Sequence, residues 1–209
     1  MEIETIPVGP YEVNCYIVRM PDARAIVVDP GDDADRIEAV ITRQGLRICA
    51  YLVTHGHTDH LCALAPLHKK YPAPIAAHAD DARWMFSERN QLPPYYPAPG
   101  RPHEELRLVA DGEELEYGGM ECRVITTPGH SPGGICFHFE EDGVLFAGDT
   151  LFQGSVGRTD LPGGSAKTLS LSLRKLATLP DSTRVYPGHG PSTTIAMEKK
   201  TNYFLRGMA

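Results

Sequence analysis

The sequence lacks the segments that membrane insertion or secretion would require. No stretch of its 209 residues approaches the roughly 20 consecutive apolar residues needed to cross a bilayer. The first residues, Met1 to Pro7, contain no basic region followed by an apolar run, which a signal peptide would have. We therefore expect a cytoplasmic protein without a membrane partner.

Cysteine is scarce and poorly placed for disulfide bonds. The five cysteines are odd in number and widely spaced, and no two of them form a Cys-x-x-Cys pair. This pattern argues against a disulfide framework and is typical of a protein from a reducing compartment.

Positive charge is also in short supply. Lys and Arg number 20 against 27 Asp and Glu, which gives a formal net charge of −7. A nucleic acid would have to be held by a local basic patch, because the overall field repels phosphate. The composition is typical of a soluble globular enzyme. It predicts no nucleic-acid partner and leaves the oligomeric state open.

Short β-branched runs and amphipathic stretches alternate along the chain. Runs at 25–28 and 48–53 flank an amphipathic stretch at 33–44 that Gly45 terminates, which predicts a strand, a helix and a strand. The same patterns predict strands at 15–18, 120–126, 135–139 and 144–147, and helices at about 167–179 and 192–205. The chain has no linker, repeat or low-complexity tract. We therefore expect a single domain, 1–209, of the α/β class, with helices covering the outer faces of its sheets.

Four side chains that can bind a metal fall within residues 55–60, directly after an apolar run. They are His55, His57, Asp59 and His60. Imidazole nitrogens and carboxylate oxygens are ligands for zinc and similar divalent ions. At a strand end, His55 and His57 can point to the same side and share one ion. The helix-forming residues at 61–70 predict a helix whose first turn contains Asp59 and His60, so these two side chains point away from the first pair. This divergence indicates two ions.

Three more donors each follow a glycine beyond a predicted strand: His130, Asp149 and His189. Glycine lets the backbone leave a strand sharply, so segments far apart in sequence can deliver side chains to one sheet edge. Seven donors are too many for one tetrahedral zinc. They suit two ions roughly 3.5–4 Å apart. The proline- and tyrosine-rich segment 90–102 is expected to overhang this site.

These motifs resemble the metallo-β-lactamase superfamily, and within it the short, single-domain glyoxalase II-like hydrolases. The similarity covers nearly the whole chain and includes Asp29-Pro30-Gly31 and the segments 148–152 and 157–160. It implies an αββα sandwich of two mixed β-sheets flanked by helices. It also implies a first metal on His55, His57 and His130, a second on Asp59, His60 and His189, and Asp149 between them. Zinc is the expected metal, with iron or manganese as alternatives.

The chemistry that the resemblance implies is hydrolysis of a small thioester, such as S-lactoylglutathione. A hydroxide bridging the two ions would attack the carbonyl, without a serine or cysteine nucleophile. We expect Asp59 to act as the catalytic residue that orients this water or takes its proton, because a carboxylate there is both ligand and neighbour to the nucleophile.

The chain departs from full-length glyoxalase II, which carries a further helical domain after its last histidine. Here 20 residues follow His189, so no glutathione-binding helical domain is expected. Where that family has a lysine and a tyrosine that contact glutathione, this chain has Arg158 and Asp160, and Pro191 replaces another tyrosine. Arg158 is predicted to bind a substrate carboxylate, with pairing to Asp160 as the alternative.

Other functions remain possible for this sequence, and some of its polar and aromatic side chains have an ordinary structural interpretation. A mononuclear iron persulfide dioxygenase of the same superfamily is the main alternative, since residues 157–160 also resemble that group, in which the equivalents of His55, His130 and Asp149 hold iron. A nuclease would need a basic track that is absent here. We interpret the remaining polar and aromatic candidates as ordinary hydrogen-bonded histidines and core packing. They are His68, His78, His103 and His138, and the cluster Trp84-Met85-Phe86.

Overall fold

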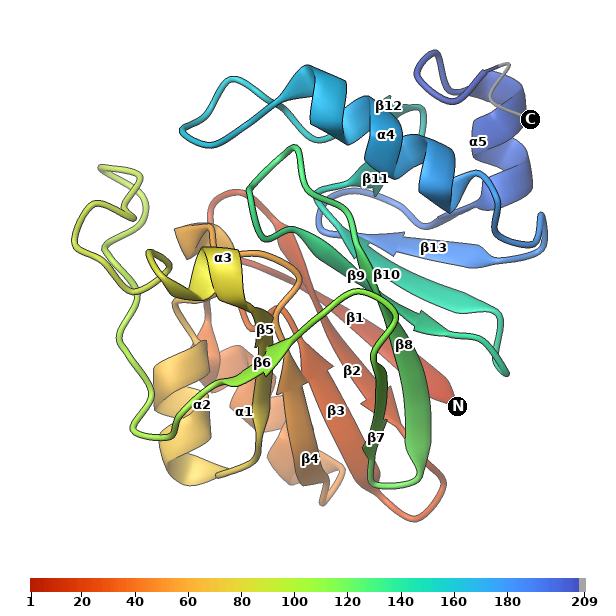
Figure 1. Ribbon diagram of the computed structural model, residues 1–209. Coiled ribbons are helices and arrows are strands. Elements are labelled where there is room, and N and C mark those ends of the chain that lie inside the picture. Colours follow the sequence, from red (N-terminus) through yellow and green to blue (C-terminus); the bar gives the residue numbers. More distant parts are fainter. Residues whose placement is uncertain (207–209) are drawn as a thin grey trace.

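The structure, a computed structural model, describes residues 1–206 and consists of two six-stranded sheets packed face to face (Figure 1). The first sheet has the order β1 (Glu2–Val8), β2 (Val13–Arg19), β3 (Arg24–Val28), β4 (Arg47–Leu52), β5 (Ile75–His78) and β6 (Arg107–Val109). Its first three strands are antiparallel, and β3 to β6 are parallel. The sheet is therefore mixed, as predicted.

The second sheet has the order β14 (Thr193–Thr194), β13 (Arg184–Pro187), β10 (Val144–Gly148), β9 (Ile135–Phe139), β8 (Met120–Thr126) and β7 (Glu114–Tyr117). Only β10 and β13 run parallel; the other neighbours are antiparallel. A small hairpin, β11 (Leu151–Phe152) and β12 (Ser155–Val156), follows β10. This sheet is mixed as well.

Helices cover the outer face of each sheet. Figure 1 shows α1 (Ala34–Arg43) and α2 (Leu64–Lys70) on one side of the molecule, and α4 (Ala166–Leu176) and α5 (Ile195–Thr201) on the other. The short α3 (Ala79–Ala82) follows β5, and a 3₁₀ turn, η1, covers Thr58–His60. Within residues 1–206 no helix has the length and apolar character to span a bilayer.

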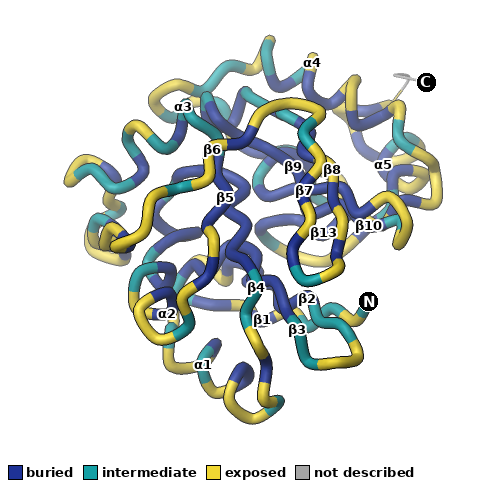
Figure 2. Tube along the Cα trace, turned by 60° about the horizontal axis from the view of Figure 1, so that its bottom comes forward, coloured by how far each residue is buried: buried dark blue, intermediate teal, exposed yellow. Residues whose placement is uncertain are grey.

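Alternation along the strands produces three layers of core. In β3, Ala25 and Val27 pack towards α1 and α2, whereas Ile26 and Val28 pack between the sheets. Because successive strand residues point to opposite faces, an uninterrupted apolar run fills both layers. The third layer lies between the second sheet and α4 and α5. Figure 2 shows the buried residues concentrated along the strands, with exposed residues on the outer loops.

Most predicted elements are confirmed, and two helices begin later than predicted. The predicted helix 33–44 is α1, with Gly45 at a φ of +62° just beyond it. The helix predicted at 61–70 begins only at Leu64, and Asp59 and His60 lie in η1 instead. The helix predicted at 192–205 is wrong in its first turn, because β-branched Thr193 and Thr194 pair with β13, and Thr194 then caps α5.

Candidate metal centre

The seven predicted donors lie on loops that leave the ends of four strands. Residues 54–60 follow β4, and His130 lies in the loop between β8 and β9. Asp149 follows β10 directly, and His189 comes soon after β13. Since β10 and β13 are parallel neighbours, their carboxyl ends bring Asp149 and His189 to the same edge of the sheet.

The donors form two groups. In the first, which we call the three-histidine group, one ring nitrogen from each of His55, His57 and His130 lies within 4.8 Å of the others. Within it, His57 Nδ1 and His130 Nε2 are 2.9 Å apart. In the second, the Asp59 group, ligand atoms of Asp59, His60 and His189 also lie within 4.8 Å of one another. The structure thus brings the donors together in the predicted division. A third set, Asp29, His55 and His60, also has ligand atoms within 4.8 Å of one another.

Asp149 lies between the two groups. Its Oδ1 is 3.5 Å from His60 Nε2, and its Oδ2 is 3.5 Å from His130 Nε2 and 3.6 Å from His189 Nε2. One carboxylate therefore faces donors of both groups, as a bridging ligand would. Gly188 makes this approach possible, because a Cβ there would lie 2.2 Å from Asp149 Oδ1.

Three buried donor atoms have no hydrogen-bond partner among residues 1–206. They are His55 Nε2, His60 Nε2 and Asp149 Oδ1. A buried polar atom without a partner costs about 1–3 kcal/mol, so such atoms are rare in folded proteins. Three of them at one place, surrounded by four more nitrogen and oxygen donors, fit the ligand set of divalent metal ions.

Ring nitrogens that face away from the centre are held by other groups. His130 Nδ1 donates to the carbonyl oxygen of Arg158 at 2.7 Å, and His189 Nδ1 donates to that of Tyr11 at 2.9 Å. His60 Nδ1 is 3.1 Å from Asp29 Oδ2. Partners of this kind fix the ring and leave the other nitrogen for a metal.

Asp29, at the end of β3, is buried and organises the strand end that carries the histidines. Its carboxylate accepts bonds from the Thr54 amide at 2.8 Å and the Thr54 hydroxyl at 2.6 Å, besides its contact with His60. The same hydroxyl is 3.1 Å from His55 Nδ1. Asp29 therefore supports one histidine directly and a second one through Thr54.

Asp81 was not found from the sequence, yet it joins two of the donor loops. This buried carboxylate in α3 accepts bonds from the Gly56 amide at 2.8 Å, the Ser131 hydroxyl at 2.6 Å and the Gly133 amide at 2.7 Å. Gly56 lies between His55 and His57, and Ser131 follows His130. An acidic residue just after a parallel strand was the available signal, but its partners lie 25 to 52 residues away.

The two groups differ in the protonation of their histidines. Burial, and then the neighbouring His130, lowers the pKa of His57 to about 3. Burial opposes the charge on His60 too, but Asp149 and Asp59 outweigh it and raise its pKa to about 10. Burial would also raise the pKa of Asp59, yet His60 and His189 lower it to about 2. His57 is therefore neutral, whereas His60 and Asp59 in the second group form an ion pair.

A cavity of about 710 Å³ opens beside the centre. Trp84, Leu92 and Leu161 contribute apolar walls, and Arg89 and Arg158 contribute positive charge. This size and mixture of surfaces are typical of small-molecule sites. The structure therefore offers room for a substrate next to the donors.

The expectation of core packing is wrong for Trp84 and confirmed for Met85. Met85 is fully buried in the core, but Trp84 lines the cavity and its ring centroid is 5.5 Å from that of His57.

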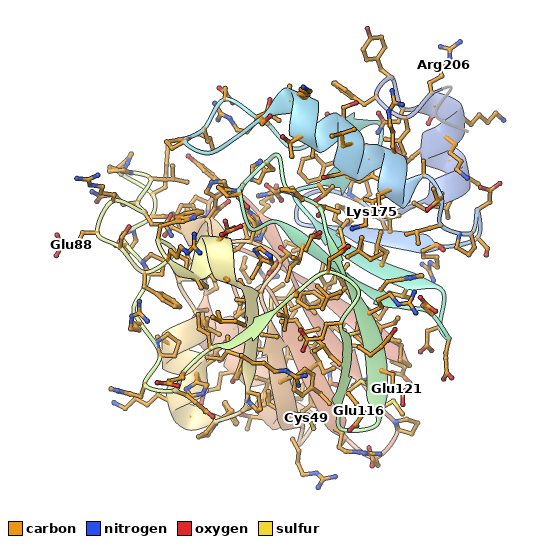
Figure 3. The ribbon with its side chains drawn as sticks, viewed as in Figure 1. Cys49, Glu88, Glu116, Glu121, Lys175 and Arg206 are labelled. Atoms are coloured by element: carbon orange, nitrogen blue, oxygen red, sulfur yellow. The ribbon has the colours of Figure 1, made fainter. Side chains whose placement is uncertain are left out.

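The 90–102 segment borders the site, since its first residues line the cavity and the Thr58 hydroxyl donates to the carbonyl of Pro97 at 2.6 Å. Figure 3 labels Glu88 on the loop before this segment, where it projects from the body of the molecule.

The remaining sequence candidates have other partners. Arg158 lines the cavity and also donates two bonds of 2.7 Å to Asp160, so both predicted contacts are compatible with its position. His68 Nε2 is 3.0 Å from Glu104, and His78 caps α3. His138, by contrast, lies buried in β9 and its Nδ1 has no hydrogen-bond partner among residues 1–206, so the expectation of a hydrogen-bonded histidine is not confirmed there.

The fold and the donor set define a class of protein, and comparison with known proteins identifies it. Residues 8–189 match the model of the metallo-beta-lactamase superfamily. The chain belongs to this superfamily, whose members bind divalent metals, and is a metal-dependent hydrolase by class. The αββα sandwich expected from the sequence is confirmed.

Two curated relatives match the chain along its whole length. It is 35% identical over 213 residues to the "Probable metallo-hydrolase YqgX" of Bacillus subtilis, covering all of both chains. It is 36% identical over 211 residues to the "Hydroxyacylglutathione hydrolase GloC" of Haemophilus influenzae, covering 98% of each.

Two solved structures are similar in fold and sequence. The BLEG-1 B3 metallo-beta-lactamase superposes with a TM-score of 0.93 at 36% identity, covering 99% of this chain and all of that one. A di-iron-bound form of TTHA1623 gives a TM-score of 0.85 at 39% identity, covering 97% of this chain and all of that one.

Proposed function

We propose that this protein hydrolyses small thioesters of the hydroxyacylglutathione type with two divalent metal ions, zinc in the first instance. The observation that carries the proposal is the convergence of seven donors, three of them with unpartnered buried atoms, beside a substrate-sized cavity. The full-length similarity to a hydroxyacylglutathione hydrolase supports the thioester as substrate.

We assign one ion to His55, His57 and His130, the second to Asp59, His60 and His189, and Asp149 to both. When bound, such ions would supply hydroxide at neutral pH and polarise the thioester carbonyl. The assignment requires His60 to give up a proton that its neighbouring carboxylates favour.

The protein's own side chains would position the reactants. Asp59 is ionised at neutral pH, and its carboxylate would orient the attacking water or take its proton. The apolar walls around Trp84, Leu92 and Leu161 would exclude bulk water from the thioester. Arg158, at the cavity wall, would bind a carboxylate of the thiol half.

The partners we propose are limited to this small-molecule substrate, without nucleic acid or membrane. The five cysteines are free in the structure, which agrees with a cytoplasmic, reducing environment. The prediction of a single domain without a glutathione-binding helical extension stays a prediction.

The experiment is metal analysis of the protein purified without added metal, combined with three assays. S-lactoylglutathione, glutathione persulfide and a chromogenic β-lactam are offered with and without oxygen. We expect about two ions per chain and oxygen-independent thioester cleavage. One iron per chain with oxygen uptake on the persulfide would establish the dioxygenase instead, and cleavage of the β-lactam alone would establish a lactamase.

A further inference from the structure

His189 is held less firmly than most of the other donors. Its side chain is 27% exposed, whereas the side chains of His60, His130 and Asp149 are between 0% and 11% exposed. One bond fixes its ring, from Nδ1 to the carbonyl oxygen of Tyr11 at 2.9 Å. The main chain at His189 is held by its bridge to Val13 and by the Asn14 amide on the Gly188 carbonyl, so the Tyr11 carbonyl acts on the orientation of the ring.

Tyr11 lies in the exposed turn between β1 and β2, whose first residue, Gly9, donates its amide to Asp33 Oδ2 at 2.9 Å. The turn is closed by a bond from the Glu12 amide to the Gly9 carbonyl at 3.1 Å. The amide of Tyr11 itself donates to the hydroxyl oxygen of Tyr96 at 3.1 Å. The amide of Tyr11 is thus held by Tyr96, while its carbonyl holds His189.

Tyr96 is a firm support for this turn. It is only 2% exposed, and its ring packs edge-on against that of Tyr11 with centroids 5.2 Å apart. Bonds between Leu92 and Tyr96 close its own loop, and the next residue, Pro97, accepts the bond from Thr58. A Cβ at Gly9 would lie 2.4 Å from the Tyr96 hydroxyl oxygen, so the turn is built closely against it.

We propose that Tyr96 is a positioning residue for the second metal: its hydroxyl holds the 9–12 turn so that the Tyr11 carbonyl orients His189. This rests on the proposed function in one respect, namely that His189 is a metal ligand. The segment 90–97 then does more than cover the cavity, because it determines how firmly the Asp59 group holds its ion.

Two single substitutions separate this role from ordinary packing. Tyr96→Phe removes the hydroxyl and keeps the ring. Tyr95→Phe is the matched control, because the Tyr95 ring also packs against Tyr11, at 5.6 Å, but its hydroxyl makes no hydrogen bond among residues 1–206. Both variants keep the aromatic cluster, so loss of packing cannot explain a difference between them.

The test is release of zinc from the fully loaded protein to a chromogenic chelator. We expect one of the two ions to leave about tenfold faster from Tyr96→Phe, the size of effect usual for partners that orient a ligand, and no change for Tyr95→Phe. Equal release rates in both variants and the wild type would overturn the proposal. So would faster release of both ions together with a lower melting temperature.

A metal-free measurement provides a second test. In ¹⁵N-labelled protein, the Nδ1 proton of His189 should be protected from exchange in the wild type and in Tyr95→Phe, and exposed in Tyr96→Phe. Unchanged protection in Tyr96→Phe would refute the positioning role. Zinc release and proton exchange do not involve a thioester, so failure of thioester cleavage with these results intact would count against the proposed function alone.

Discussion

The two donor groups lie side by side but differ in the charge of their own side chains. The three-histidine group has no carboxylate among its three members, and burial keeps His55 and His57 neutral. The Asp59 group contains its own carboxylate, and His60 is also close to Asp29 and Asp149. Neutral imidazoles can accept a metal at once, whereas a protonated one must first lose its proton. We therefore expect the three-histidine group to fill first.

The supports of the two groups differ as well. Asp81 ties together the loops that carry the three histidines, all through buried hydrogen bonds. The Asp59 group relies on the buried Asp29 at one end and on the exposed turn at Tyr11 at the other. The histidines of the first group are thus supported by buried residues, whereas those of the second are supported partly by an exposed turn.

Asp149→Ala should weaken metal binding by both donor groups, because the Asp149 carboxylate faces both. We expect both ions to be lost or weakly held, and thioester cleavage to fall by at least about 10²-fold, as when a charge-stabilising group is removed from an active site. Metal content and kcat would measure this. Asp181→Ala serves as the control, because it removes an exposed carboxylate that pairs with Lys199 and belongs to neither donor group. Retention of both ions at full affinity would contradict the bridging position.

Gly188→Ala should damage the Asp59 group more than the three-histidine group. The added Cβ would lie 2.2 Å from Asp149 Oδ1 and 2.7 Å from His60 Cε1, so both side chains must shift. Metal titration should show loss of the second ion and retention of the first. The melting temperature of the metal-free protein should fall by a few degrees, because the displaced side chain of His60 is buried and that of Asp149 nearly so. Binding of two ions with unchanged affinity would show that the centre tolerates the displacement.

The sequence was a good guide to the donors because their signal is local. His55, His57, Asp59 and His60 share one short run, and the other three donors each follow a glycine at a strand end. The apolar runs likewise predicted three strands of each large sheet, whereas the expectation of two sheets came from the family resemblance. Such features can be recognised without knowing which segments meet in space.

The supports could not be predicted, because they depend on contacts between distant segments. Asp81 reaches loops that lie 25 to 52 residues away, and Tyr96 reaches a turn 85 residues away. Trp84 lies beside buried Met85, and only the arrangement of the loops places its ring at the cavity. Neither a motif nor hydrophobic periodicity carries this information.

Asp81→Asn and Asp29→Asn should affect different groups. Both substitutions keep the size of the side chain and remove its charge and one acceptor. We expect Asp81→Asn to weaken the first metal-binding step about 10- to 100-fold. Asp29→Asn should act mainly on the second step, because Asp29 contacts His60 directly but reaches His55 only through the hydroxyl of Thr54. Stepwise calorimetric titration of each variant separates the steps. If both substitutions weakened the same step equally, the two donor groups would share one support, which would contradict separate roles for Asp81 and Asp29.

The smallest effect is expected at Arg158, whose main chain and side chain serve different purposes. Its carbonyl holds His130 and survives in Arg158→Ala, so metal content and kcat should stay unchanged. Its guanidinium is exposed and already paired with Asp160, so loss of a substrate carboxylate contact should raise KM only about twofold to fivefold. Asp160→Asn would free the guanidinium and should lower KM. Arg89 lines the same cavity and has no carboxylate partner among residues 1–206. A larger KM increase in Arg89→Ala would therefore identify Arg89 as the residue that binds the substrate carboxylate.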